Sequence, residues 1–520
     1  MSASKQDMTF PDLPPLHLWN MSARTAGHPG FHMPGHAAAR FFTNNYAQAL
    51  ISIDTTELSS SDDLHDPSGP ALLAMRESSR LYGSGETLFV TTGSTTGIQV
   101  MTASIITPAT FLLIPRTVHM SVLHVLALLD CEYAFIPYPE KADRSQASNS
   151  RNPYLYPQLS AQGLEDALNL FPQATDILLV SPDYYGQCAD LPALAVIARS
   201  HRCRLLVDEA HGSHFSFAKD LFPPDAMSSG ADMCVQSLHK TLPALTMASQ
   251  IHISADAIRS GKVSSLHVWD MLRLFETSSP SFVIAASSEF ALAWMEKHGS
   301  LALAERIRDI QTFTARIAPL LGEQNTEIVR PGRTDPLHLV LSCDPDLVSA
   351  PELMEALEKR GIYIEFADLL RLVLIISPWQ SSQDFDALFD AVSDSVCHMH
   401  TQRSAARAAG IRDGRTYRHP LPGDAAALDA LWGTVLTGVP QRGISLRSAV
   451  FGGYEKETMN LAQAVDRICA SAIAPYPPGI AVLWPGERIS KVHIEVLQRL
   501  DELKIAVRGV HSGEIDVLLE

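Results

Sequence analysis

Short apolar runs alternate with amphipathic segments over the first half of the chain. Between residues 70 and 285, apolar runs at 86–92, 111–115, 176–181 and 203–208 are separated by stretches with the spacing of helices. The runs are short and lack the strict polar alternation of strands with one face in water. Parallel strands covered by helices on both faces produce this pattern. We therefore predict an α/β fold built on a large, mainly parallel sheet.

The pattern changes after residue 285. A long helical segment at 288–321 is followed by strand candidates at 337–344, 361–368 and 370–378, which are typical of a smaller α/β domain. The predicted organisation is an N-terminal arm (1–65), a large domain (66–285), a small α/β domain (286–400), a linker (401–444) and a C-terminal α+β domain (445–520).

Composition narrows the class of function. The chain has 520 residues and a net charge of −17, which argues against a nucleic-acid-binding or anionic-membrane surface. The first residues lack the basic and apolar regions of a secretory signal, and no apolar run is long enough to span a bilayer. The seven cysteines form no close pairs, which favours reduced thiols over disulfides or a metal site. We expect a cytoplasmic protein with no nucleic-acid, membrane or metal partner.

A lysine and an aspartate stand where apolar runs end. Lys240 lies in "SLHKT", just after the run 231–236. Lysine in such a setting is typical of a nucleophile, because partial desolvation favours the neutral amine. Asp208 ends the run 203–208, where a carboxylate is costly unless it has a partner. That partner could be the protonated ring nitrogen of pyridoxal phosphate (PLP); the alternative is an aspartate that caps a turn.

Three further features fit a phosphate-bearing cofactor, and each has a structural alternative. The turn "TTGSTTG" could bind phosphate through a helix N-terminus and the hydroxyls of Ser94 and Thr95, or could simply cap that helix. Ser237 and His239 could supply a second phosphate contact or form a surface loop. His119 could stack on a cofactor ring or cap a helix. The order and combination of these features favour one cofactor site.

The chain resembles the Orn/Lys/Arg decarboxylases, PLP enzymes of the aspartate-aminotransferase type (fold type I). The matching stretches run from about residue 31 to 490: "FHMPGH", "DTTELSSSDDLHDPSG", "TTGSTTGIQVM", "IPRTVHMS", "SPDYYGQCADL", "VDEAHGSHF", "GADMCVQSLHKTLPALTMAS", "TSSPSF" and "YPPGIAVLWPGERIS". The chain is similar to the compact members, which lack an N-terminal receiver-like domain. It departs from the usual motifs at Ala37, Ala39, Met120, Asp183 and Leu238.

This resemblance implies a role for each candidate residue. Lys240 would bind PLP covalently and act in catalysis together with His211, while Asp208 would pair with the ring nitrogen. The remaining cofactor contacts would be His119 and Ala210 on the two ring faces and Ser94, Thr95, Ser237 and His239 at the phosphate. His36 and Glu487 would contact the substrate. For Glu487 the alternative is an acid at a helix N-terminus.

The resemblance also implies an activity, the decarboxylation of arginine, lysine or ornithine to an amine and CO2. It implies a homo-oligomer, at least a dimer, with a place in polyamine biosynthesis; the choice among the three substrates stays open. One alternative is an aminotransferase or another PLP reaction on the same fold. The other is an inactive paralogue that binds partners, which would be expected to lose Lys240 or Asp208.

Overall fold

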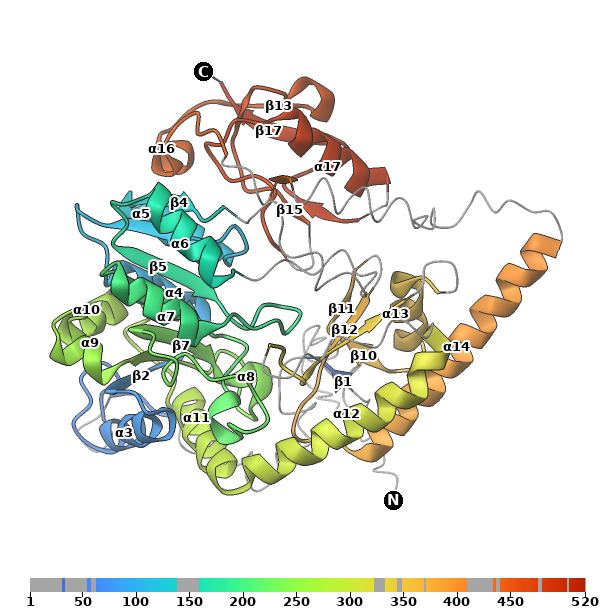
Figure 1. Ribbon diagram of the computed structural model, residues 1–520, viewed down its shortest axis with the longest axis horizontal. Coiled ribbons are helices and arrows are strands. Elements are labelled where there is room, and N and C mark those ends of the chain that lie inside the picture. Colours follow the sequence, from blue (N-terminus) through green and yellow to red (C-terminus); the bar gives the residue numbers. More distant parts are fainter. Residues whose placement is uncertain are drawn as a thin grey trace, which may run out of the picture.

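The computed structural model describes residues 30–32, 54–57, 62–137, 159–321, 333–343, 348–368, 371–408, 434–435, 440–475, 479–502 and 505–519. Its centre is a seven-stranded sheet in the order β2-β8-β7-β6-β5-β3-β4, covered by helices (Figure 1). The strands are β2 (Glu86–Val90), β3 (Phe111–Ile114), β4 (Glu132–Phe135), β5 (Asp176–Val180), β6 (Arg204–Asp208), β7 (Met233–Ser237) and β8 (Ser249–Ile253). Both pairings of β8 are antiparallel and the others are parallel. The predicted α/β fold is confirmed.

Both faces of the sheet are apolar because each is covered. Successive residues of a strand point to opposite faces, so Leu205 of β6 packs in one buried cluster and Leu206 in another. The helices of this domain are α3 (Pro70–Tyr82), α4 (Ser94–Ala103), α5 (Met120–Leu129), α6 (Ala161–Leu170), α7 (Leu191–Ser200), α8 (Leu238–Thr241), α9 (Ala255–Arg259), α10 (Ser265–Phe275) and α11 (Phe282–Trp294). Polar N-caps such as Ser160 and Asp190 begin several of them.

A smaller α/β unit follows along the chain. It contains an antiparallel sheet of β11 (Phe366–Ala367), β12 (Arg371–Ile375) and β9 (His338–Ser342), and a parallel pair of β1 (Gly30–Phe31) and β10 (Tyr363–Ile364). Its helices are α12 (Ser300–Leu321), α13 (Ala350–Glu358) and α14 (Ser382–Ala408), and the short π-helix η2 (Met295–Gly299) joins α11 to α12. Helix α14 continues past residue 400, where the sequence pattern predicted a linker, because the segment is rich in alanine and arginine, which are strong helix formers.

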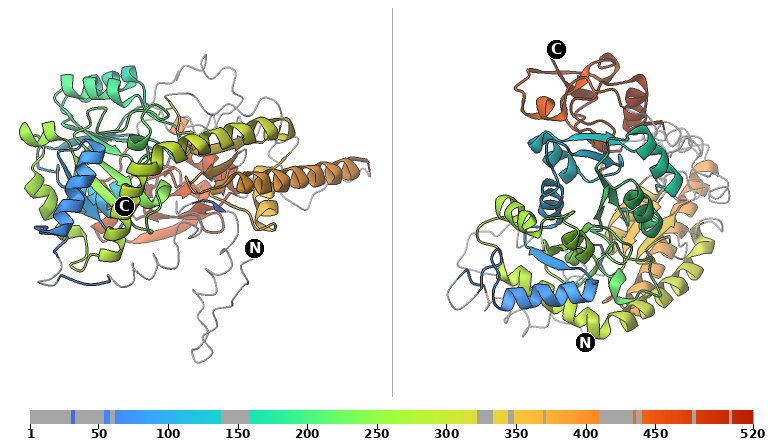
Figure 2. Two further views of the ribbon diagram at one scale, coloured as in Figure 1. Left: turned by 90° about the horizontal axis from the view of Figure 1, so that it is seen from below. Right: turned by 60° about the vertical axis from the view of Figure 1, so that its left-hand side comes forward.

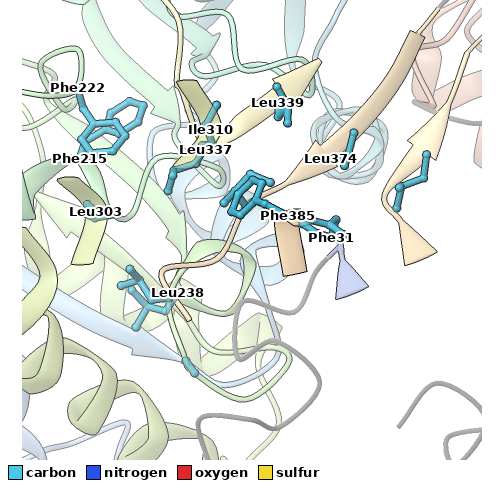
Figure 3. Packing of buried hydrophobic residues seen from close by; sticks show 14 of the residues in the cluster. Phe31, Phe215, Phe222, Leu238, Leu303, Ile310, Leu337, Leu339, Leu374 and Phe385 are labelled. Carbon is cyan, nitrogen blue, oxygen red and sulfur yellow. The ribbon is translucent and has the colours of Figure 1, made fainter. Parts of the chain in front are cut away.

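One buried cluster connects the segments that carry the candidate site. It contains Leu238, two residues before Lys240, and Leu337, next to the start of β9; both are fully buried. Figure 3 shows these side chains with Leu303, Phe385 and others of the same cluster. The shared core holds α8 of the large unit in a fixed position relative to β9 of the smaller one.

The C-terminal unit lies beside the edge of the large sheet that ends in β4 (Figure 2). Its elements are α16 (Leu446–Phe451), β13 (Lys456–Asn460), η3 (Leu461–Gln463), β14 (Ile468–Cys469), β15 (Ala474–Pro475), α17 (Lys491–Glu502), β16 (Val507–Arg508) and β17 (Glu514–Leu518). Trp484 is buried against Phe135 of β4, with ring centroids 4.7 Å apart. Across the whole described part of the chain, no helix is both long and apolar enough to cross a membrane.

Candidate active site

Lys240 and Asp208 come together at the carboxyl ends of neighbouring parallel strands, the usual place of ligand sites in such sheets. Asp208 is the last residue of β6, and Lys240 lies in the short helix α8 directly after β7. Burial lowers the pKa of Lys240, opposed by the negative charges of Asp208 and Glu365. The environment therefore favours the neutral, nucleophilic form of this amine more than water would.

Asp208 is a buried carboxylate, only 4% exposed. Burial raises the pKa of Asp208, opposed mainly by the charge of Lys240 and then by that of His119. Its Oδ1 accepts from the backbone N–H of Ala210 at 3.1 Å, and no side chain of the described residues donates to it. A buried carboxylate of this kind fits a cationic partner such as a protonated pyridine nitrogen.

Hydroxyls from two segments meet beside this pair. Ser237 Oγ lies 2.7 Å from Ser94 Oγ, the first residue of α4, and Thr95 next to it is exposed. Helix α4 can approach β7 this closely because Gly97 has no side chain: a Cβ there would lie 2.9 Å from Val235 Cγ1. Helix N-terminal amides together with hydroxyls form a site that suits a phosphate group.

The turn before α4 is held by Glu276, a residue that the sequence analysis did not single out. Glu276 Oε1 accepts from the backbone N–H groups of Thr91 at 2.6 Å and Thr92 at 3.1 Å. Its other oxygen, Oε2, lies 3.0 Å from His65 Nε2. Glu276 therefore orders the segment that presents the hydroxyl-rich turn.

The two remaining histidines of the predicted cofactor site lie at helix ends. His119 is the N-cap of α5, where its Nδ1 accepts from Ser121 N at 3.2 Å, and its ring is exposed. His239 lies in α8, with Nδ1 3.0 Å from Ala248 O. Ala210 is buried, and its carbonyl accepts from Ser237 N. The exposed ring of His119, close enough to Asp208 to influence its pKa, is available for stacking on a ligand ring.

His211 touches the lysine directly. Its Nε2 lies 2.9 Å from Lys240 Nζ, and its Nδ1 lies 3.1 Å from His338 Nε2. The ring of Tyr184 packs edge-on against His211, with centroids 5.1 Å apart. Burial, followed by the positive charge of Lys240, holds the pKa of His211 well below its ordinary value. A neutral imidazole beside an amine can exchange a proton with it.

Glu487 forms a buried ion pair that neither sequence-based interpretation included. Its carboxylate oxygens accept from Arg116 Nη1 at 2.9 Å and Nη2 at 2.7 Å, and both side chains are almost fully buried. Oε2 also accepts from Trp484 N at 3.0 Å. Helix α17 begins at Lys491, so Glu487 is outside its first turn. Its geometry is that of a structural ion pair between the C-terminal unit and the segment that leads to His119.

The sequence departures fall into three groups. Ala37 and Ala39 lie outside the described residues, and so does His36, whose role as a substrate contact stays a prediction. Asp183 organises the turn after β5, because its Oδ1 accepts from the backbone N–H groups of Tyr185 and Gln187, each at 2.9 Å. The other two departures serve the fold: Leu238 fills the shared core, and Met120 is the first residue of α5.

Glu365 is a second acid near the lysine that the sequence analysis missed. It is half-buried in the small unit, and its charge acts on Lys240. Its Oε1 accepts from the hydroxyl of Tyr184 at 2.7 Å. Only the tertiary structure brings Glu365 to α8, so the sequence offered no signal beyond an acid within the apolar segment 361–368.

Comparisons with known proteins agree with this geometry. The family model of the Orn/Lys/Arg decarboxylase major domain matches residues 15–346, and that of the C-terminal domain matches residues 448–511. The chain belongs to the Orn/Lys/Arg decarboxylase family. It is 31% identical to the uncharacterized protein YaaO of Bacillus subtilis, with 94% of each chain covered. It is 26% identical to an arginine decarboxylase of the same organism, again over 94% of each chain.

Solved structures share the fold of this family member. The lysine decarboxylase LdcF of Francisella novicida superposes with a TM-score of 0.75 at 18% sequence identity, covering 93% of this chain and 76% of that one. The architecture is that of the fold type I PLP enzymes. Family and fold together imply PLP, and the buried carboxylate, the amine and the hydroxyl-rich helix N-terminus described above fit that cofactor.

Proposed function

We propose that this protein is a PLP-dependent decarboxylase of a basic amino acid, releasing an amine and CO2. The observation that carries the proposal is the meeting of Lys240, whose pKa is lowered by burial, with the buried carboxylate of Asp208 at adjoining strand ends. Relatives named arginine decarboxylase and lysine decarboxylase support the substrate class.

Different candidate residues would bind different parts of the cofactor. Lys240 would bind the aldehyde carbon of PLP, and Asp208 would keep the ring nitrogen protonated. Ser94, Ser237 and the start of α4 would hold the phosphate, with Thr95 and His239 at its edge; His119 and Ala210 would lie against the ring. When bound, PLP withdraws electrons from the bond that is broken. His211, 2.9 Å from Lys240 Nζ, is placed to move a proton to and from that amine.

We further propose Glu365 as the group that recognises the distal cation of the substrate. The charge of Glu365 acts on Lys240, and Glu487 is paired with Arg116. The bond from Tyr184 to Oε1 fixes the orientation of the carboxylate. A fixed carboxylate in a half-buried site discriminates strongly in favour of a cationic side chain.

An aminotransferase would need an arginine for the substrate α-carboxylate. In the small unit, Arg333 is exposed. Arg371 is buried on β12, and its Nη1 donates to Asp368 while its guanidinium lies over the ring of Tyr185. Decarboxylation loses the substrate α-carboxylate and transamination retains it, so the products separate the two reactions.

The proposal extends to setting and assembly. The seven cysteines, all of them in the described part of the chain, are thiols and not disulfides, which supports a reducing cytoplasmic location. We also propose a homo-oligomer, at least a dimer, that acts on its substrate as a step toward polyamines, in keeping with the amines that such a reaction releases.

The decisive experiment measures products. Purified protein supplied with PLP is incubated with arginine, lysine or ornithine, and CO2, amine and keto acid are quantified. The proposal expects stoichiometric CO2 and amine from at least one of the three, and Lys240→Ala serves as the inactive control. Keto-acid formation without CO2 would replace the proposal with an aminotransferase. No turnover of any substrate by PLP-loaded protein would favour a binding paralogue.

A further inference from the structure

A chain of hydrogen bonds leads from Lys240 into the small unit. Lys240 Nζ lies 2.9 Å from His211 Nε2, and His211 Nδ1 lies 3.1 Å from His338 Nε2. His338 Nδ1 then lies 2.7 Å from Asp335 Oδ2. The side chains of Asp335 and His338 are 0% exposed. Water therefore does not compete for the bonds of His338, to His211 on one side and to Asp335 on the other, so each donor there needs the neighbouring side chain as its acceptor.

Asp335 determines which side chain donates and which accepts in these hydrogen bonds. Its Oδ1 accepts from Leu337 N at 2.9 Å and lies 3.0 Å from His214 Nε2. Burial opposes ionisation of Asp335, but the two neighbouring imidazoles outweigh it and hold the pKa of this carboxyl below its ordinary value. An ionised carboxylate can only accept hydrogen bonds.

The tautomers follow from that acceptor. His338 has to donate its Nδ1–H to Asp335, which leaves His338 Nε2 as an acceptor. His211 then donates its Nδ1–H to His338, and the lone pair of His211 Nε2 faces Lys240. The carboxylate thus determines the protonation of a ring that it does not touch, by the logic through which an aspartate fixes the histidine of a serine protease.

We propose that Asp335 and His338 are positioning residues that hold His211 as the proton acceptor for Lys240. One proton moves from the Lys240 ammonium to His211 Nε2: an N–H bond breaks on the lysine and one forms on the imidazole. Lys240 becomes a neutral amine and His211 an imidazolium that still donates to His338. The inference rests on the proposed function for the role of Lys240 and adds two residues that act through His211.

The fold holds this pair against the large unit. Gly186, in the loop after β5, has φ +78°, and a Cβ at that position would lie 2.5 Å from His338 Cβ. Its carbonyl accepts from Asp335 N at 2.7 Å. Only glycine permits this approach. Since His211 belongs to the large unit and His338 to the small one, the correct tautomer requires both units in place.

One substitution, Asp335→Asn, should reverse the direction of these hydrogen bonds. In Asp335→Asn the N–H of Leu337 keeps the amide oxygen at the Oδ1 position, so the amide nitrogen faces His338 Nδ1 and donates to it. His338 would then carry its proton on Nε2 and donate to His211 Nδ1. His211 would in turn present an N–H to Lys240, and it could no longer accept a proton from the ammonium.

The first test reads the tautomers without any catalysis. Nitrogen NMR of PLP-free protein with labelled histidine distinguishes protonated from unprotonated ring nitrogens, and His211→Gln identifies the His211 signals. The expected result is Nδ1–H in the wild type and Nε2–H in Asp335→Asn. A wild-type His211 protonated on Nε2 would overturn the proposal, as would an unchanged tautomer in folded Asp335→Asn.

The second test separates positioning from packing by kinetics of the PLP-loaded enzyme. His338→Gln can accept from His211 and donate to Asp335, so its kcat should stay within about threefold of wild type. Asp335→Asn and His338→Phe should lower kcat by about tenfold or more at nearly unchanged KM, because proton transfer contributes on the order of 10²–10⁴ in rate. His201→Gln, a half-exposed histidine beside Glu165, is the control.

Every outcome of the two tests either supports or overturns the role of Asp335 and His338. Equal losses in His338→Gln and His338→Phe, together with lower melting temperatures, would make the pair purely structural and overturn the inference. If the wild type releases no CO2 from any basic amino acid, the proposed function fails, and the tautomer measurement still decides the inference.

Discussion

Replacing Glu487 by glutamine removes the negative charge that faces Arg116 while keeping the size of the side chain. Arg116 donates to both carboxylate oxygens, at 2.9 and 2.7 Å, and the side chains are only 1% and 2% exposed. Removing one partner of a buried pair costs about 3–5 kcal/mol, because the remaining charge stays buried without compensation. The amide retains one oxygen acceptor for Arg116, so we expect the free energy of unfolding to fall by about 3 kcal/mol, the lower end of this range.

The assay is thermal and urea-induced unfolding, with limited proteolysis to follow release of the C-terminal unit. The matched control is Glu355→Gln, which breaks a pair with Lys359 whose side chains are 66% and 70% exposed. Exposed pairs of this spacing contribute about 0.3–0.5 kcal/mol, so the free energy of unfolding of the control variant should change by no more than that. The double variant Arg116→Met, Glu487→Leu should recover much of the loss, because apolar replacement of a buried pair is often neutral.

The same variant tests the substrate role that the sequence suggested for Glu487. An unchanged unfolding midpoint together with a tenfold rise in KM for a basic amino acid would refute the structural reasoning and restore that role. A lower midpoint with unchanged KM in the protein that remains folded supports the ion pair.

Three further outcomes are expected. Lys240→Ala should abolish the borohydride-fixed link to PLP, measured by mass spectrometry. Asp208→Asn should retain some PLP, and both kcat and PLP affinity are measured. A charge-assisted contact contributes about 1.5–3 kcal/mol to binding, or about one to two decades, and the loss in kcat should exceed that. A near-normal kcat would refute the assignment of Asp208. Because burial lowers the pKa of Lys240 below its ordinary 10.5, the stability of PLP-free protein should rise with pH between the lowered value and 10.5, and Lys240→Met should remove that increment in urea unfolding.

The sequence alone was sufficient for the parts of the site that depend on local order. Apolar runs with residues buried on both faces identify parallel strands. Each strand ends where its apolar run ends, so the positions of Asp208 and Lys240 at strand ends follow from the order of residues along the chain. The hydroxyl-rich turn before α4 followed from the same reasoning, because the start of an amphipathic helix is visible in its spacing. Motif order then led to the family.

Only the tertiary structure decided which distant side chains meet. Arg116 and Glu487 are 371 positions apart, and His211 and His338 are 127 apart. Neither contact leaves a periodic signal, because a single polar residue in an apolar segment looks the same whether its partner is water or a buried charge. Glu487 therefore looked like a helix-start acid or a substrate contact until packing placed Arg116 against it. Glu365 joins Asp208 as a second acid whose charge acts on Lys240, because the docking of one α/β unit on another, and not local sequence, places it there.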